Sequence, residues 1–282
     1  MIIPSYGSFL SCLFFGSILI LYLCVESRNI NFIIKNGCNL IIISTIFVII
    51  RLFFPCNFVF THNVLIKKVE CLVIDQLRKK IIYRIEILDI LMLVALIGFL
   101  IKIGLLVYRQ YSFYKIIQIY PSLKDSRMNR ILDELKQKRN VQKNIRLIQT
   151  SFIHTPCIVG FFKPTILLPD LDLSDIEIGY ILKHELQHYL HHDLWYSLIC
   201  EILTCVYWWN PVCYLLKKHL NRMLEIANDD VITCDMKEKE KIDYLKCLLK
   251  VAQVSKTEQV HQPSLCYVEN NSQLLKQRTL FL

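Results

Sequence analysis

The pentapeptide His184-Glu185-Leu186-Gln187-His188 sets the chemistry expected of this 282-residue chain and much of its architecture. It reads H-E-x-x-H, and on a helix two residues four positions apart lie on the same face. Both imidazoles can then reach one Zn²⁺ ion, while Glu185 lies next to the attacking water as a base. The pattern predicts a zinc site with hydrolytic chemistry. The alternative is a polar helix face whose two histidines have ordinary hydrogen-bond partners.

A capping signal upstream places the pentapeptide inside a helix. Ser174-Asp175-Ile176-Glu177 has a hydroxyl at the cap and a carboxylate three residues later, which is the pattern of a capping box. We therefore expect a helix that begins at this signal and holds the two histidines one turn apart.

An acidic stretch downstream supplies a candidate third ligand. A catalytic zinc needs three protein ligands and an open position for water. Glu225 lies in a stretch that reads as helical, and Asp229 follows one turn later on the same face. Asp229 could accept a hydrogen bond from a ligand imidazole and so orient it. For Glu225 taken alone, the alternative is a solvated surface glutamate.

Two stretches upstream of the motif read as short strands. Residues 144–151 and 157–168 are rich in Ile, Val, Phe and Thr, and prolines at 156, 164 and 169 punctuate them. A strand edge beside a zinc-binding helix can hold an extended peptide through main-chain hydrogen bonds. The sequence therefore predicts a small strand layer next to the motif helix.

The first 110 residues contain three long apolar runs, which we predict as transmembrane helices at residues 9–25, 36–54 and 88–107. The chain is 54% hydrophobic, which is unusual for a soluble protein of this length. The first run has no basic start and no clear cleavage site, so we interpret it as a retained span rather than a signal peptide. A buried helical bundle is the alternative.

Residues 194–216 are also apolar apart from Glu201 and would pass for a fourth span. A full crossing would place Glu225 and His188 on opposite sides of the membrane, where they could not share a metal ion. We therefore expect a membrane-associated helical hairpin that is broken at Asn210-Pro211. The predicted domains are a membrane domain at 1–110 and a metallopeptidase domain at 111–282 that includes this hairpin.

Four motifs resemble, in order and spacing, those of the BlaR/MecR-like membrane zinc metallopeptidases. They are the segment from His154 to Pro169, the H-E-L-x-H helix, the Trp209-Asn210-Pro211 step, and the E-x-A-x-D stretch from Glu225 to Asp229. The resemblance implies an α+β membrane protein, in which N-terminal transmembrane helices precede a gluzincin-like zinc metallopeptidase domain with a short strand layer and an H-E-x-x-H helix.

The resemblance also implies a role for each matching residue. His184, His188 and Glu225 would be the zinc ligands, and Glu185 would be the catalytic base. Asp229 would hydrogen-bond to a ligand histidine. The substrate edge would be formed by Val159, Gly160, Phe161 and Phe162.

Three departures from the family pattern are visible. The family often has Cys where Asn228 stands, and Arg-Arg-Gly-Asp where this chain has His191-His192-Asp193. Its antibiotic sensors also carry a further span and an external penicillin-binding domain, which we do not find in this sequence. The inducing signal is therefore expected from a separate sensor protein, or from a domain missing from a truncated chain.

Basic residues suggest which side of the membrane holds the metallopeptidase domain. Eight Lys and Arg residues between 109 and 139 follow the third run and favour the cytoplasm by the positive-inside rule, although the loop at 55–83 carries five more on the expected outer side. The net charge of +9 suits anionic lipids, and direct nucleic-acid binding is not expected because no basic patch is interleaved with aromatics. The sequence leaves undecided whether Cys56 and Cys71, both in the outer loop, form a disulfide.

The expected function is a membrane zinc endopeptidase that cleaves a cytoplasmic protein, and the resemblance implies a transcriptional repressor as its substrate. The alternatives are a protease of the CAAX-prenyl type, a non-catalytic receptor or scaffold that keeps the zinc fold, and a metal transporter. The last is disfavoured because the three apolar runs contain no histidine. His191, His192 and His219 are open candidates for a donor to the oxyanion.

Overall fold

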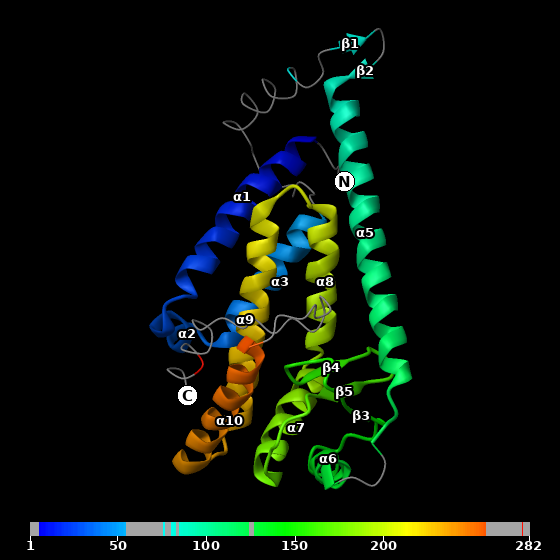
Figure 1. Cartoon of the computed structure of the whole chain (residues 1–282). Coiled ribbons are helices and arrows are strands. Elements are labelled where there is room, and N and C mark those ends of the chain that lie inside the picture. The colour runs from blue at the N-terminus through cyan, green and yellow to red at the C-terminus, as the bar shows by residue number, and fades with distance from the viewer. Residues whose placement is uncertain are drawn as a thin grey trace. The chain divides into compact units, whose positions relative to one another are not determined.

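The computed structural model describes residues 6–54, 76, 80–82, 85–123, 127–257 and 278 (Figure 1). They form two compact units, one made of Met1–Leu105 with Cys200–Leu220, the other of Leu106–Ile199 with Asn221–Leu282. Residues 200–216 of the predicted hairpin therefore belong to the first unit, although the sequence assigned the whole hairpin to the second domain. Cys56, Cys71 and residues 258–277 lie outside the described residues.

The first unit begins with three apolar helices. They are α1 (Tyr6–Glu26), α2 (Ile30–Asn36) and α3 (Cys38–Phe53). The side chain of Asn29 caps α2 by accepting the Asn31 N–H, and α2 lies at 105° to the second part of α1. Gly37, with a φ of +76°, separates α2 from α3. The predicted span at 36–54 is therefore a 16-residue helix preceded by a break.

A short antiparallel pair, β1 (Lys80–Ile82) and β2 (Ile85–Glu86), leads into α5 (Ile87–Ile119). Among the described residues, α5 alone is long and apolar enough to cross a membrane, or one of two if α1 and α2 count as one bent span. Apolar side chains along its first half are about half exposed, including Leu93, Leu96 and Leu100. The helix runs 12 residues past the predicted end at 107, and the three-span arrangement stays a prediction.

The apolar segment at 194–216 folds as two helices, α8 (Asp193–Val206) and α9 (Pro211–Thr233). Pro211 takes the first position of α9, where its missing N–H costs nothing, and the Asn210 side chain accepts the Val212 N–H at 3.0 Å. Within the first unit, Lys217 donates to Glu201 at 2.6 Å. The chain therefore reverses at the step predicted to break the helix.

The second unit contains a three-stranded sheet. Its strands are β3 (Arg146–Gln149), β4 (Cys157–Val159) and β5 (Thr165–Leu168), in the spatial order β3-β5-β4. β5 runs parallel to β3 and antiparallel to β4. β4 is therefore an edge strand of the described sheet, and the two stretches predicted as strands contain all three.

Alternate side chains of a strand point to opposite sides of a sheet. Both faces of this sheet are buried, because a separate hydrophobic cluster covers each of them. One face packs with the helices α6 (Arg127–Lys138), α7 (Asp175–Leu190) and α10 (Glu238–Thr257). The buried residues on this side include Leu147, Ile158, Ile166, Ile178, Leu182 and Leu186. The other side is covered by Phe113 and Ile117 from the end of α5, which pack with Ile148, Cys157 and Leu167.

α7 is the central helix of the second unit, since α6, α10 and β4 all contact it (Figure 1). The predicted capping box is confirmed at its start. The Ser174 hydroxyl accepts the Glu177 N–H at 3.3 Å, and the Glu177 carboxylate accepts the Ser174 N–H at 2.8 Å. The H-E-x-x-H pentapeptide lies in the second half of this helix, against the sheet.

A glycine in the turn between β4 and β5 gives a test of the strand layer. Gly160 has a φ of +88°, and a Cβ atom there would lie 2.5 Å from the Lys163 carbonyl oxygen. We expect Gly160→Ala to lower the free energy of unfolding by about 1–3 kcal/mol. The matched control is Gly179→Ala inside α7, where the new Cβ would lie 3.8 Å from Ile131 and should not destabilise. Equal thermal unfolding of the two variants would contradict the turn geometry.

Candidate metal centre

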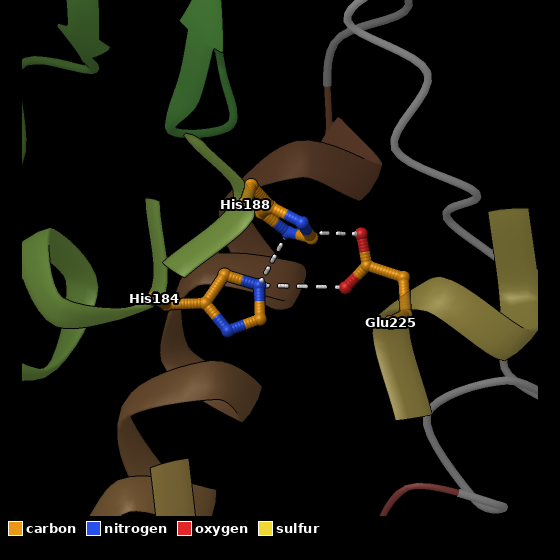
Figure 2. A group of neighbouring side chains, drawn as sticks. All are labelled: His184, His188 and Glu225. Atoms are coloured by element: carbon orange, nitrogen blue, oxygen red, sulfur yellow. Dashed lines mark hydrogen bonds and ion pairs between the residues drawn. The ribbon is translucent and has the colours of Figure 1, made fainter. Parts of the chain in front are cut away.

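Three side chains from two helices converge in the second unit (Figure 2). His184 and His188 extend from α7, one turn apart, and Glu225 extends from α9. The Nε2 atoms of the two histidines are 3.1 Å apart. Glu225 places Oε2 at 3.4 Å from the first of them and Oε1 at 3.5 Å from the second.

The donor set and its spacing fit a zinc ion. Ligand atoms about 2.0–2.1 Å from a tetrahedral zinc lie roughly 3.3–3.4 Å from one another. The observed separations of 3.1, 3.4 and 3.5 Å bracket this range. Two imidazoles and one carboxylate would leave a fourth position for water, as in catalytic rather than structural zinc sites.

His188 is oriented by a carboxylate at the start of the next helix. Its Nδ1 donates to Asp193 Oδ2 at 2.6 Å, which leaves Nε2 as the free acceptor. The link between α7 and α8 is short because His192 adopts a φ of +60°. This is the position where the resembled family often has glycine, which reaches that conformation without strain. The turn, and with it Asp193, is thus kept without the glycine.

His184 is oriented through a tyrosine of α10. Its Nδ1 lies 2.9 Å from the Tyr244 hydroxyl, which donates in turn to Asp229 Oδ1 at 2.6 Å. Asp229 itself is 3.4 Å from the same nitrogen. The contact predicted between Asp229 and a ligand histidine is present at that distance, and the shorter hydrogen bonds run through Tyr244. Both imidazoles thus keep Nε2 available for a metal.

Buried charges around the histidines set the electrostatics of this site. Burial alone would lower the pKa of His184, but hydrogen bonds with Asp229 and Glu225 raise that pKa to about 10. Burial would raise the pKa of Glu225, but the charges of His188, Arg278 and His184 lower it to about 2. Because Zn²⁺ binds neutral imidazole, its binding must release protons from this site.

Glu185 is buried beside the two histidines and next to the edge strand. Burial raises the pKa of its carboxyl group, and the neighbouring His188 and His184 only partly offset that rise. The backbone of Ile158 in β4 is near enough to the carboxyl group to lower this pKa slightly. A carboxyl group with a raised pKa is suited to proton transfer near neutral pH.

The four residues predicted as a substrate edge line a groove of about 930 Å³ in the second unit. Val159, Gly160, Phe161 and Phe162 form one wall, together with residues from the end of α5 and the start of α8. The ring centroid of Trp195 lies 4.6 Å from that of Phe161 and 6.1 Å from that of Phe162. The lining is therefore largely aromatic and apolar next to the β4 edge.

Three residues of the site were missed by the reasoning from sequence. They are Asp193, Tyr244 and Arg278, which contact His188, Asp229 and Glu225 from other elements. Asp193 carried a signal, since it matches the last residue of the family's Arg-Arg-Gly-Asp pattern. Tyr244 carried a weaker one, as a residue with a polar tip on the apolar face of its helix.

Two of the candidate oxyanion donors, His219 and His191, belong to different units. His219 belongs to the first unit, where its Nδ1 lies 3.0 Å from the Ser27 hydroxyl and its Nε2 lies 3.2 Å from the Thr45 hydroxyl. Both of its nitrogens are therefore engaged by side chains of the first unit, whereas the three candidate ligands belong to the second. His191 contacts the side-chain amide of Gln187 at 2.8 Å.

The two partners that orient the histidines can be tested by conservative substitution. Asp193→Asn and Tyr244→Phe keep the side-chain shape but weaken the hold on one imidazole each. We expect each to lower zinc affinity by about 10–100-fold, measured by competition with a chromophoric chelator. Asp243→Asn, which changes a half-exposed carboxylate on α10, is the matched control and should bind zinc as the wild type does. Unchanged affinity in both test variants would exclude this role for the two residues.

Comparison with known proteins relates this chain to a peptidase family. A family model described as BlaR1 peptidase M56 matches residues 60–282. The methicillin resistance protein MecR1 of Staphylococcus aureus strain Mu50 is 27% identical over 165 residues, which cover 57% of this chain and 28% of that protein. The MecR1 protein of Staphylococcus epidermidis gives the same values.

A second kind of relative is the regulatory protein BlaR1 of Bacillus licheniformis, which is 27% identical over 121 residues. This match covers 42% of the present chain and 20% of BlaR1. The chain thus spans less than a third of the length of the curated relatives it matches. The family model nevertheless covers more than three quarters of the chain and all the candidate ligands. The chain therefore belongs to the BlaR1 peptidase M56 family.

Proposed function

We propose that this protein is an integral membrane zinc endopeptidase that cleaves a cytoplasmic protein in a signalling response. The observation that carries the proposal is the convergence of three metal-binding atoms from His184, His188 and Glu225, with a buried carboxyl group at Glu185 beside them. Family membership supports peptide-bond hydrolysis rather than another zinc reaction. It also argues against the alternative of a CAAX prenyl protease.

Each residue of the site has a chemical task in this proposal. Bound zinc would supply Lewis acidity, lowering the pKa of a coordinated water towards about 7 and polarising the scissile carbonyl. Glu185 takes a proton from the attacking water and later delivers it to the leaving amine nitrogen. Asp193 and Tyr244 keep the two imidazoles in the tautomer that presents Nε2.

Substrate binding is assigned to the edge of β4. An extended peptide can add to an edge strand through main-chain hydrogen bonds, with alternate side chains entering neighbouring pockets. β4 contacts α7, the helix that carries Glu185, so a peptide along this edge would pass near the base. The apolar groove beside Phe161 and Phe162 favours a bulky apolar side chain in the substrate.

The membrane location rests on α5 and the apolar helices before it. α5 exposes apolar side chains over a length sufficient to cross a bilayer, and such a surface is costly in water. The basic residues that follow this run support a cytoplasmic position for the metal centre. The relatives' names refer to methicillin resistance and regulation. Following the family resemblance, we take a transcriptional repressor as the proposed substrate and a separate sensor protein as a proposed partner.

Replacing the base tests the proposal. Glu185→Gln should keep zinc, because the residue is not among the candidate ligands, but lower peptide cleavage by about 100-fold or more. His184→Ala should lose both zinc and cleavage. The measurement combines metal content with cleavage of a candidate repressor and of a generic peptide pool by the detergent-purified chain.

The outcomes separate an enzyme from a scaffold. Wild-type protein that binds zinc but cleaves neither the repressor nor the peptide pool would support a non-catalytic receptor that keeps the zinc fold. Full cleavage by the Glu185→Gln protein would remove this residue from the mechanism.

A further inference from the structure

Arg278 contacts the candidate metal centre, and none of the roles assigned above uses its charge. It comes from far along the chain, yet it is only 9% exposed. Its Nε and Nη2 donate to the two oxygens of Asp229, at 2.5 and 2.8 Å. Its remaining terminal nitrogen, Nη1, lies 3.2 Å from Glu225 Oε2. One guanidinium therefore contacts two carboxylates, with a different nitrogen on each of three oxygens.

The geometry uses the property that distinguishes arginine from lysine. A guanidinium is planar, always charged, and presents a rigid fork that matches a carboxylate with two parallel hydrogen bonds. Glu225 and Asp229 are one helical turn apart on α9, where two like charges repel. The fork on Asp229 and the third nitrogen on Glu225 hold both anions on the same face of the helix.

Both carboxylates are linked to His184, one by direct contact and the other through Tyr244. Glu225 Oε2, which Arg278 contacts, is the oxygen that lies 3.4 Å from His184 Nε2. Asp229 Oδ1 accepts from Arg278 and also from the Tyr244 hydroxyl, the group that contacts His184 Nδ1. Arg278 thus acts on the third candidate ligand directly and on the first through Asp229 and Tyr244.

We propose that Arg278 is a positioning residue of the metal centre, which fixes Glu225 and Asp229 so that the three donor atoms are arranged for zinc before the ion binds. The inference rests on the zinc site proposed above and adds a residue to it from the C-terminal part of the sequence. Arg278 does not touch the reacting atoms, so it is not a catalytic residue.

Two effects of the arginine on zinc affinity have opposite signs, and this makes the proposal testable. A cation near a divalent ion repels it, so removal of a purely electrostatic arginine would tighten zinc binding. Loss of a residue that orients ligands weakens binding, by about 10–100-fold for partners of this kind. The sign of the change in affinity therefore distinguishes positioning from simple charge balance.

The experiment uses the full chain in detergent and measures the zinc dissociation constant by chelator competition. The variants are Arg278→Gln and Arg278→Lys, and the control is Arg127→Gln, which removes an exposed Arg–Asp pair at 2.6 Å. We expect zinc binding about 10–100-fold weaker in Arg278→Gln and partial recovery in Arg278→Lys, which keeps the charge but not the fork. The visible spectrum of bound Co²⁺ should change in Arg278→Gln and not in the control.

Zinc affinity equal to or tighter than wild type in Arg278→Gln, with an unchanged cobalt spectrum, would overturn the proposal. Thermal unfolding of each metal-free variant checks that the fold is intact. If Arg278→Gln does not fold, Arg278→Lys decides, and wild-type affinity and spectrum in that variant would overturn it equally. Wild-type protein that binds no zinc would instead defeat the proposed function, so the two failures are distinguishable.

Discussion

The structure depends on bringing two imidazoles and one carboxylate to a single point from helices that an apolar segment separates in sequence. His184 and His188 share one face of α7, but Glu225 follows only after α8 and half of α9. The chain must therefore reverse between these helices, and the break before Pro211 and the Lys217–Glu201 pair accomplish this within the first unit. A continuous helix from 194 to 216 would carry Glu225 away from the histidines.

Once the three donors meet, their surroundings determine whether they can serve a metal. Buried imidazoles need partners for the nitrogen that faces away from the ion, and Asp193 and Tyr244 supply them. Asp229 is only 1% exposed, and its charge is balanced by Arg278. The same network that orients the donors also satisfies the buried charges. Loss of any one member would leave another buried polar or charged group without its partner.

Local signals in the sequence were sufficient for the parts of the site that lie within one element. The capping box predicted the start of α7, the i and i+4 spacing predicted that both histidines share a face, and Asn210-Pro211 predicted the break between α8 and α9. Glu225 was reached by combining its helical context with the need for a third ligand. Asp229 followed from its spacing to Glu225. The contacts of Tyr244 and Arg278 could not be derived in this way, because they join segments 15 and 49 residues from Asp229, and local spacing does not show which distant residues meet. The predicted span at 88–107 covers only the apolar part of α5, because residues 108–119, with Arg109 and Lys115, do not read as a membrane run.

The most direct test of the metal centre is the zinc content of the detergent-purified chain, measured for wild type beside Glu225→Ala. Catalytic zinc sites use three protein ligands, so the loss of one should release or strongly weaken the ion. About one zinc per chain in the wild type, with much less in the variant, is the result that the geometry predicts. Equal zinc in both proteins, or none in the wild type, would contradict the placement of Glu225 beside the two histidines as a metal ligand.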